Sequence, residues 1–191
     1  MRFTFRAMRL AGIVLALCYA ASAADQLDYR ILATTKTSTM EKEMNEAADA
    51  GFVFSNVMGG ESAVGGKEVL VAMMKNLTTP GEGKRKYKLL ATSKTSTMQK
   101  EMQQYADEGF EYLGQTVFQS ALGGREVVVL MERDPARKGE PSSYRLLATT
   151  KTSTMEKELK EAGEQGYVLM GLTLGKTAVG GAEVVSILRK K

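Results

Sequence analysis

The sequence predicts an α+β protein built from three tandem β-α-β-β repeats, each a three-stranded sheet with one helix packed on one face. Three observations lead to this prediction. A 48-residue segment occurs three times without a gap, at 29–76, 87–134 and 144–191, and 17 of its 48 columns are identical in all copies. Inside each copy, apolar residues recur at helical spacing after a short apolar segment, and each copy closes on a second apolar run.

Each repeat opens on a predicted strand that begins with Tyr, written YRILATT, YKLLATS and YRLLATT. A helix follows over about 39–50 and the equivalent spans, because one apolar face repeats along it. In the first repeat this face consists of Met40, Met44, Ala47 and Ala48. Gly51, Gly109 and Gly166 come next, where a left-handed C-terminal cap is expected because Gly adopts positive φ without steric cost.

The phrase TSTMEKE, or TSTMQKE in the second repeat, predicts the start of that helix. Ser38 is followed three residues later by Glu41, and the other two copies keep the same spacing. This is the capping-box pattern, in which the Ser hydroxyl accepts from an N–H of the first turn and the Glu side chain accepts from the N–H of the Ser. We therefore expect Ser38, Ser96 and Ser153 to be the N-caps.

The rest of each repeat predicts a β-hairpin. An aromatic residue follows the capping Gly and opens a second strand, and a Gly-Gly pair at 65–66, 123–124 and 180–181 forms the turn. The third strand is the most continuously apolar segment, as in EVLVAMM and EVVVLM. Such a run is typical of a strand covered on both faces, so we expect it in the centre of each sheet.

The N-terminus predicts export. Three Arg residues within the first nine positions precede an apolar stretch of about twelve residues, and ASA at 21–23 is a small-residue cleavage site. The stretch is shorter than the roughly 20 residues that cross a bilayer. We predict a signal peptide at 1–23 and a periplasmic or secreted mature chain, with a retained anchor as the alternative.

The composition argues against nucleic-acid binding, metal binding and catalysis. The chain has 26 Lys+Arg and 22 Asp+Glu; three of the Arg precede residue 24, which leaves 23 − 22 = +1 and no basic stripe for nucleic acid. The one Cys, Cys18, lies in the leader, and the chain has no His. Without these side chains the mature protein lacks the usual zinc ligands and the group that titrates near neutral pH. We expect no metal, no cofactor and no enzymatic activity.

The repeats resemble the bacterial domain of unknown function 4177 family. The matching passages are MNEAADAGFVFSNV, MQQYADEGFEYLGQ and LKEAGEQGYVLMGL, with endings VAMMK, VLMER and ILRK. Phe52, Phe110 and Tyr167 stand where that family has Trp. The resemblance implies a β-α-β-β module, and it implies no activity because the family has none to transfer.

The candidate ligand site is an anion site at each helix start. A helix N-terminus presents free N–H groups and a partial positive charge, and here one Lys and three hydroxyls accompany it. The residues concerned are Lys36, Thr37, Ser38, Thr39, Lys94, Thr95, Ser96, Thr97, Lys151, Thr152, Ser153 and Thr154. The plain alternative is that Ser caps the helix and Lys faces solvent.

The functional hypothesis is an exported, non-enzymatic binding or interaction module. Its rivals are an enzyme using Lys and carboxylates between repeats, which needs a pocket that gathers Lys36, Lys94 or Lys151 with acids, and an envelope-associated structural protein. Linkers are expected at 77–86 and 135–143. A 48-residue unit without disulfide or metal is too small to be stable alone, so the repeats are expected to pack on one another, with a homodimer as the alternative.

Overall fold

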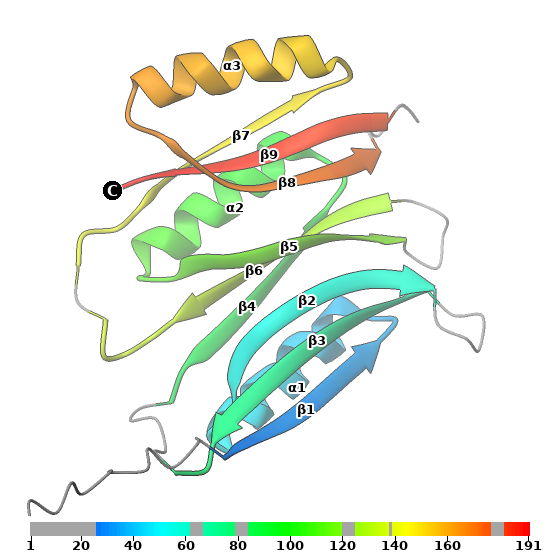
Figure 1. The fold of residues 1–191 in the computed structure, drawn as a ribbon, viewed down its shortest axis with the longest axis vertical. Coiled ribbons are helices and arrows are strands. Elements are labelled where there is room, and N and C mark those ends of the chain that lie inside the picture. The colour runs from blue at the N-terminus through cyan, green and yellow to red at the C-terminus, as the bar shows by residue number, and fades with distance from the viewer. Residues whose placement is uncertain (1–25, 62–66, 79–83, 120–124, 138, 177–181) are drawn as a thin grey trace, which may run out of the picture.

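The protein's structure, a computed structural model, describes residues 26–61, 67–78, 84–119, 125–137, 139–176 and 182–191 (Figure 1). The predicted leader and the three Gly-Gly turns lie outside these residues. Unit 1 contains β1 (Leu27–Thr34), α1 (Thr37–Asp49), β2 (Val53–Glu61) and β3 (Lys67–Asn76). Unit 2 contains β4 (Lys86–Thr92), α2 (Thr95–Asp107), β5 (Glu111–Gln119) and β6 (Arg125–Arg133). Unit 3 contains β7 (Ser143–Thr149), α3 (Thr152–Glu164), β8 (Val168–Lys176) and β9 (Ala182–Lys190).

Each unit forms one antiparallel sheet with its third strand in the centre. The strand orders are β1-β3-β2, β4-β6-β5 and β7-β9-β8. The predicted α+β class, the three β-α-β-β units and the central place of the third strand are therefore confirmed. The second strand of each unit has a bulge two residues into the strand, between Phe54 and Asn56 in β2 and at the equivalent positions of β5 and β8.

The helices begin two residues earlier than predicted, and the capping box is wrong. Lys36, Lys94 and Lys151 are the N-cap residues, and no side chain caps any of the three helices. Lys36 is extended, with φ −128° and ψ 121°, and its carbonyl already accepts the first helical hydrogen bonds, so Ser38 lies inside the first turn. The hydroxyl of Thr34 accepts from the Lys36 N–H at 3.1 Å, which fixes the strand-to-helix turn.

The helix ends agree with the sequence. Gly51, Gly109 and Gly166 have φ of 88°, 88° and 84°, the left-handed region that favours Gly. In unit 1 the Gly51 N–H donates to the Ala48 carbonyl and the Phe52 N–H donates to the Ala47 carbonyl. This Schellman-type arrangement satisfies the last carbonyls of the helix and turns the chain into the second strand.

The units stack in an open row, with unit 1 at the bottom of Figure 1 and unit 3 at the top. Each helix packs on its own sheet and also on the first strand of the next unit, α1 against β4 and α2 against β7. One buried cluster accordingly joins Met40 and Met44 of α1 with Tyr87 and Leu89 of β4. Sheets and helices therefore alternate along the row.

This alternation explains the burial of the central strands. In β6 the consecutive residues Val128, Val129, Leu130 and Met131 are all fully buried, because a helix covers each face of the middle sheet. Strand β3 instead alternates, with Val69, Val71 and Met73 buried and the residues between them half-buried. The sheet of unit 1 has its own helix on one face and none of the described elements on the other.

Two glycines allow the second strands of successive units to approach closely. A Cβ added at Gly114 would lie 3.2 Å from Val57 Cγ1 of the preceding unit, and one added at Gly171 would overlap the Tyr112 hydroxyl oxygen. The equivalent residue in unit 1 is Asn56, whose side chain accepts from its own neighbour's N–H. No described unit lies against unit 1 on that side, so the close approach that requires a Gly in units 2 and 3 does not arise there.

Candidate functional site

The most specific chemistry in the chain lies between the units. Tyr87, the first residue of the unit 2 repeat, is buried between α1 and the second strand of unit 1. Its hydroxyl accepts from the Phe54 N–H at 2.9 Å. Its backbone N–H and carbonyl both pair with the side-chain amide of Asn45, each at 3.0 Å. A side-chain amide thus bonds to the edge strand as another strand would.

Glu41 completes this contact. Its carboxylate binds the next unit and so does not cap its own helix. One carboxylate oxygen accepts from the Leu89 N–H at 3.1 Å, and the other pairs with the Lys88 ammonium at 2.9 Å. The hydrogen bond to Glu41 is the main reason that the pKa of Lys88 is raised above its ordinary value. The predicted capping residue is therefore a docking residue for the next unit.

The same geometry joins units 2 and 3. Tyr144 is buried, its hydroxyl accepts from the Tyr112 N–H at 2.7 Å, and its own N–H donates to the Gln103 side-chain oxygen at 3.0 Å. Gln99, in the place of Glu41, accepts from the Leu146 N–H at 3.0 Å. The contact is heterologous: a helix-and-second-strand surface of one unit binds the first strand of the next.

The two ends of the row each present one half of this contact, and no other described part of the chain binds to either half. We call the exposed side of unit 1 the head face; its residues are Leu27, Tyr29, Ile31 and Met58, with Leu70, Ala72 and Met74 half-buried beside them. Tyr29 is 59% exposed, whereas its equivalents Tyr87 and Tyr144 are 2% and 4% exposed. The difference arises because no helix of the described chain covers the head face.

The opposite end, which we call the tail face, belongs to α3 and β8. Its residues are Glu156, Lys160, Val168, Leu169, Leu172 and Leu174. Glu156 stands in the place of Glu41 and Gln99, and it pairs along its own helix, with Lys160 at 2.6 Å. Leu172 and Leu174 are more than half exposed. Leu159, equivalent to the buried Met44, is likewise only half-buried.

The structure places the predicted anion-site residues on the first turn of three separate helices. The sets are Lys36 to Thr39, Lys94 to Thr97 and Lys151 to Thr154, and in each the Lys is the exposed N-cap. No side chain caps these turns, so N–H groups are open to an anion. This geometry agrees with anion binding but does not require it.

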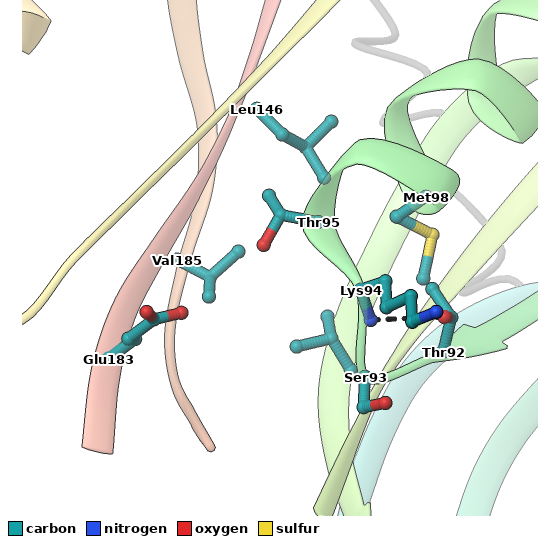
Figure 2. A pocket seen from close by; sticks show the side chains of 9 residues that line it. Thr92, Ser93, Lys94, Thr95, Met98, Leu146, Glu183 and Val185 are labelled. Atoms are coloured by element: carbon teal, nitrogen blue, oxygen red, sulfur yellow. Dashed lines mark hydrogen bonds between the residues drawn. The ribbon is translucent and has the colours of Figure 1, made fainter. Parts of the chain in front are cut away.

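A crevice at the start of α2 contains Lys94 and Thr95 of the second set (Figure 2). Lys94 and Thr95 lie across from Leu146 and Val185 of unit 3, and Glu183 lies at the same opening. Its volume is about 10 Å³, room for about one water and too little for a phosphate. The Glu183 carboxylate would also repel an anion there. Lys94 shares this crevice with one acid, Glu183. A Lys/carboxylate enzyme would need at least two acids beside the Lys.

A larger and more open groove crosses the second strands of all three units. Its volume is about 590 Å³, and its lining is apolar with three threonines and no ionisable side chain: Gly59, Thr116, Val117, Thr152, Leu172, Thr173, Leu174 and Val184. Leu172 and Leu174 also belong to the tail face. The groove therefore extends the apolar surface at that end of the row.

Two further properties bear on function. Within the ranges that the structure describes, no helix combines the length and apolarity that a membrane crossing requires. Among those same residues, no group of acidic side chains is placed to hold a metal ion. Neither observation decides whether the protein is an enzyme.

Comparison with family models, with curated proteins and with solved structures finds no match. The resemblance to the domain of unknown function 4177 family therefore stays a prediction.

Sequence reasoning missed the docking role of the residues at positions 41 and 45 of the first repeat and their equivalents. A signal was present: Glu or Gln is followed four residues later by Asn or Gln in the first two repeats and by Lys in the third, which puts two polar side chains on one helix face. The capping pattern accounts for the first of these residues and says nothing of the second. The Tyr that opens each repeat is explained in the sequence by strand propensity alone, although in units 2 and 3 its hydroxyl docks the unit on the preceding one.

We expect millimolar phosphate to raise the melting temperature if the helix starts bind anions, because only the folded state presents those N–H groups together. Replacing Lys36, Lys94 and Lys151 with Met should remove the shift. Lys42, Lys100 and Lys157, six residues further on in each helix, provide the matched control: their replacement with Met should keep it. A wild-type melting temperature that does not respond to phosphate contradicts the anion site.

The docked tyrosines predict an alkaline limit to stability. Burial is the first cause of raised pKa values for Tyr87 and Tyr144, and it raises the pKa of Tyr112 to about 12, against 10.0 in the unfolded chain. The stabilisation is fully present below pH 10 and is lost above it, where the unfolded chain releases protons that the folded chain retains. Each tyrosine contributes at most about 1.4 kcal/mol per pH unit.

The measurement is the free energy of unfolding against pH from neutral to strongly alkaline conditions. Tyr144→Phe should flatten the alkaline fall, since Phe has no proton to release. An unchanged slope in that variant would exclude the Tyr144 hydroxyl as a source of the pH dependence.

Proposed function

We propose that this chain is an exported, non-enzymatic interaction module that binds protein partners through the two ends of its row of repeats. One observation carries the proposal. Tyr29 is 59% exposed at the head face although Tyr87 and Tyr144, in the same position of the other units, are almost completely buried. Both ends present a surface that the fold itself uses for docking.

The apolar side chains exposed on the head and tail faces indicate that these faces bind a protein partner and do not simply contact solvent. Repeat proteins that end in water generally place a polar outer face on the terminal repeat. Here the head face exposes Tyr29, Ile31 and Met58, and the tail face exposes Leu172 and Leu174. Soluble monomers seldom expose contiguous apolar patches of this kind unless a partner covers them.

Export rests on the N-terminal sequence, with its basic start, apolar stretch and small-residue cleavage site. Binding without catalysis rests on the mature chain's lack of His and Cys and on the small crevice at Lys94. An envelope-associated structural protein remains the second candidate, favoured by the same apolar ends. Cell fractionation separates the two, because the second candidate sediments with the envelope.

The test places a photo-crosslinking amino acid at Tyr29 or at Leu172 in cells, with the exposed Gln104 of the middle unit as the control position. We expect discrete adducts from the two end positions and none from Gln104. The identified partner, once purified, should bind the wild-type chain and lose at least tenfold in affinity for Ile31→Lys or Leu172→Lys. Equal adduct formation at all three positions, or none at the ends, would overturn the proposal.

A further inference from the structure

The head and tail faces are the two halves of one heterologous contact that the chain forms twice internally. In both internal contacts, the helix and second strand of one unit bind the first strand of the next. Among the residues that the structure describes, none covers that helix and second strand in unit 3, and none covers that first strand in unit 1. The tail face of one molecule is therefore complementary to the head face of another.

We propose that a second copy of this chain occupies these faces, the tail face of one molecule binding the head face of the next. The proposal rests on the proposed function and names its partner. Because a head-to-tail contact joins two different faces, it generates an open row of molecules, or a ring where the rotation closes, rather than a two-fold dimer.

The polar groups at the two ends match those of the internal contacts. Glu156 can accept from the Ile31 N–H as Glu41 accepts from Leu89, and Arg30 stands in the place of Lys88. The Tyr29 hydroxyl can accept from the Leu169 N–H as Tyr87 accepts from Phe54. Strand β1 is an edge strand of its sheet, so the N–H groups on its outer side are free for this pairing.

The apolar groups match as well. Leu169 and Leu172 occupy the positions of Phe54 and Val57, which contact the next unit at Gly114. In the proposed contact they cover Ile31 and the half-buried side of β3. Both patches are apolar and exposed in the single chain, so their mutual burial favours association.

Two residues depart from the internal pattern and make the contact weaker. Lys160 replaces the amide of Asn45 and Gln103, so it can donate to a strand carbonyl but cannot accept from the Tyr29 N–H. Asn56 replaces Gly114 and Gly171, where the second strands approach closely. Association between molecules should therefore be reversible, whereas the tethered internal contacts are permanent.

The first experiment measures sedimentation of the full chain over a wide range of concentration. The wild type should form species larger than a dimer. Ile31→Lys, which blocks the head, and Leu172→Lys, which blocks the tail, should each remain monomeric, since every molecule of a variant then lacks the same one of the two faces that the contact needs. Mixing the two variants should give a one-to-one dimer and nothing larger, because one free head then meets one free tail. Gln104→Lys, in the middle unit, should assemble as the wild type does.

Three results would overturn the proposal. A monomeric wild type does so; if crosslinking at the ends then identifies a different protein, the proposed function survives and only this inference fails. A dimer formed by either variant alone shows a two-fold contact through one face. Assembly that persists in both variants arises outside these faces.

The second experiment restores the internal geometry. Lys160→Gln recreates the amide of Gln103 and should tighten assembly about fivefold, the effect of one added hydrogen bond. Lys157→Gln removes the same charge from an exposed position of the same helix and should change little. Equal effects of the two substitutions would attribute the change to charge and contradict the proposed docking geometry.

Discussion

Replacing Tyr87 or Tyr144 with Ala should lower the free energy of unfolding by about 3–5 kcal/mol, whereas Tyr29→Ala should cost less than about 1 kcal/mol. The three residues occupy the same position of the three repeats and differ in what covers them. Tyr87 and Tyr144 are buried between units, and Tyr29 is exposed at the head face. The chain therefore contains its own matched control for the energy of a unit-to-unit contact.

The expected cost has two parts. The larger part is the apolar ring, whose removal leaves a cavity between the helix of one unit and the sheet of the next. The smaller part is the hydroxyl, which accepts a backbone N–H of the preceding unit at 2.9 Å for Tyr87 and 2.7 Å for Tyr144. Tyr87→Phe removes only the second part and should cost about 1–3 kcal/mol, because the Phe54 N–H then loses its partner.

Denaturant unfolding followed by circular dichroism and by a probe in each unit measures these effects. Stability in a repeat protein is the sum of unit and interface terms, so a lost interface also reduces cooperativity. In Tyr87→Ala, unit 1 should unfold separately from units 2 and 3. If all three Ala variants lose the same stability, the tyrosines do not act through the contacts described above.

The fold class could be predicted because each repeat marks its elements with local chemistry. Met40 and Met44 at helical spacing gave the buried face of the helix, and Gly51 gave its end. The apolar third segment gave the central strand. These signals lie within about 50 residues of one another and depend on propensity and periodicity alone.

The contacts between units could not be predicted in the same way. Glu41 fits a capping box as well as it fits a docking role, and only the position of β4 beside α1 decides between them. Likewise, the exposure of Tyr29 follows from its being first in the row, which its local sequence does not reveal. Identical residues in three repeats therefore differ in burial because their neighbours differ.

Arg85, unlike the docking residues, compensates a buried charge within its own unit. Arg85, which immediately precedes β4, contacts both carboxylate oxygens of Glu132 at 3.1–3.2 Å, and its other terminal nitrogen pairs with Asp134 at 3.1 Å. The Glu132 side chain is 2% exposed. Its charge lies beside Tyr87, at the contact between units 1 and 2.

Arg85→Met should therefore destabilise the protein by about 3–5 kcal/mol, since it leaves the buried Glu132 carboxylate without the positive charge that compensates it. Replacing both residues, Arg85→Met with Glu132→Met, should recover most of that loss, because two apolar side chains replace the buried pair. Arg137→Met is the matched control: it removes another Arg–carboxylate pair, but Glu111 retains Arg189 at 3.3 Å, and an exposed pair contributes only about 0–1 kcal/mol. Chemical denaturation of the four proteins measures these differences. A double variant as unstable as Arg85→Met would mean that Arg85 stabilises the chain through its packing and not by compensating the charge of Glu132.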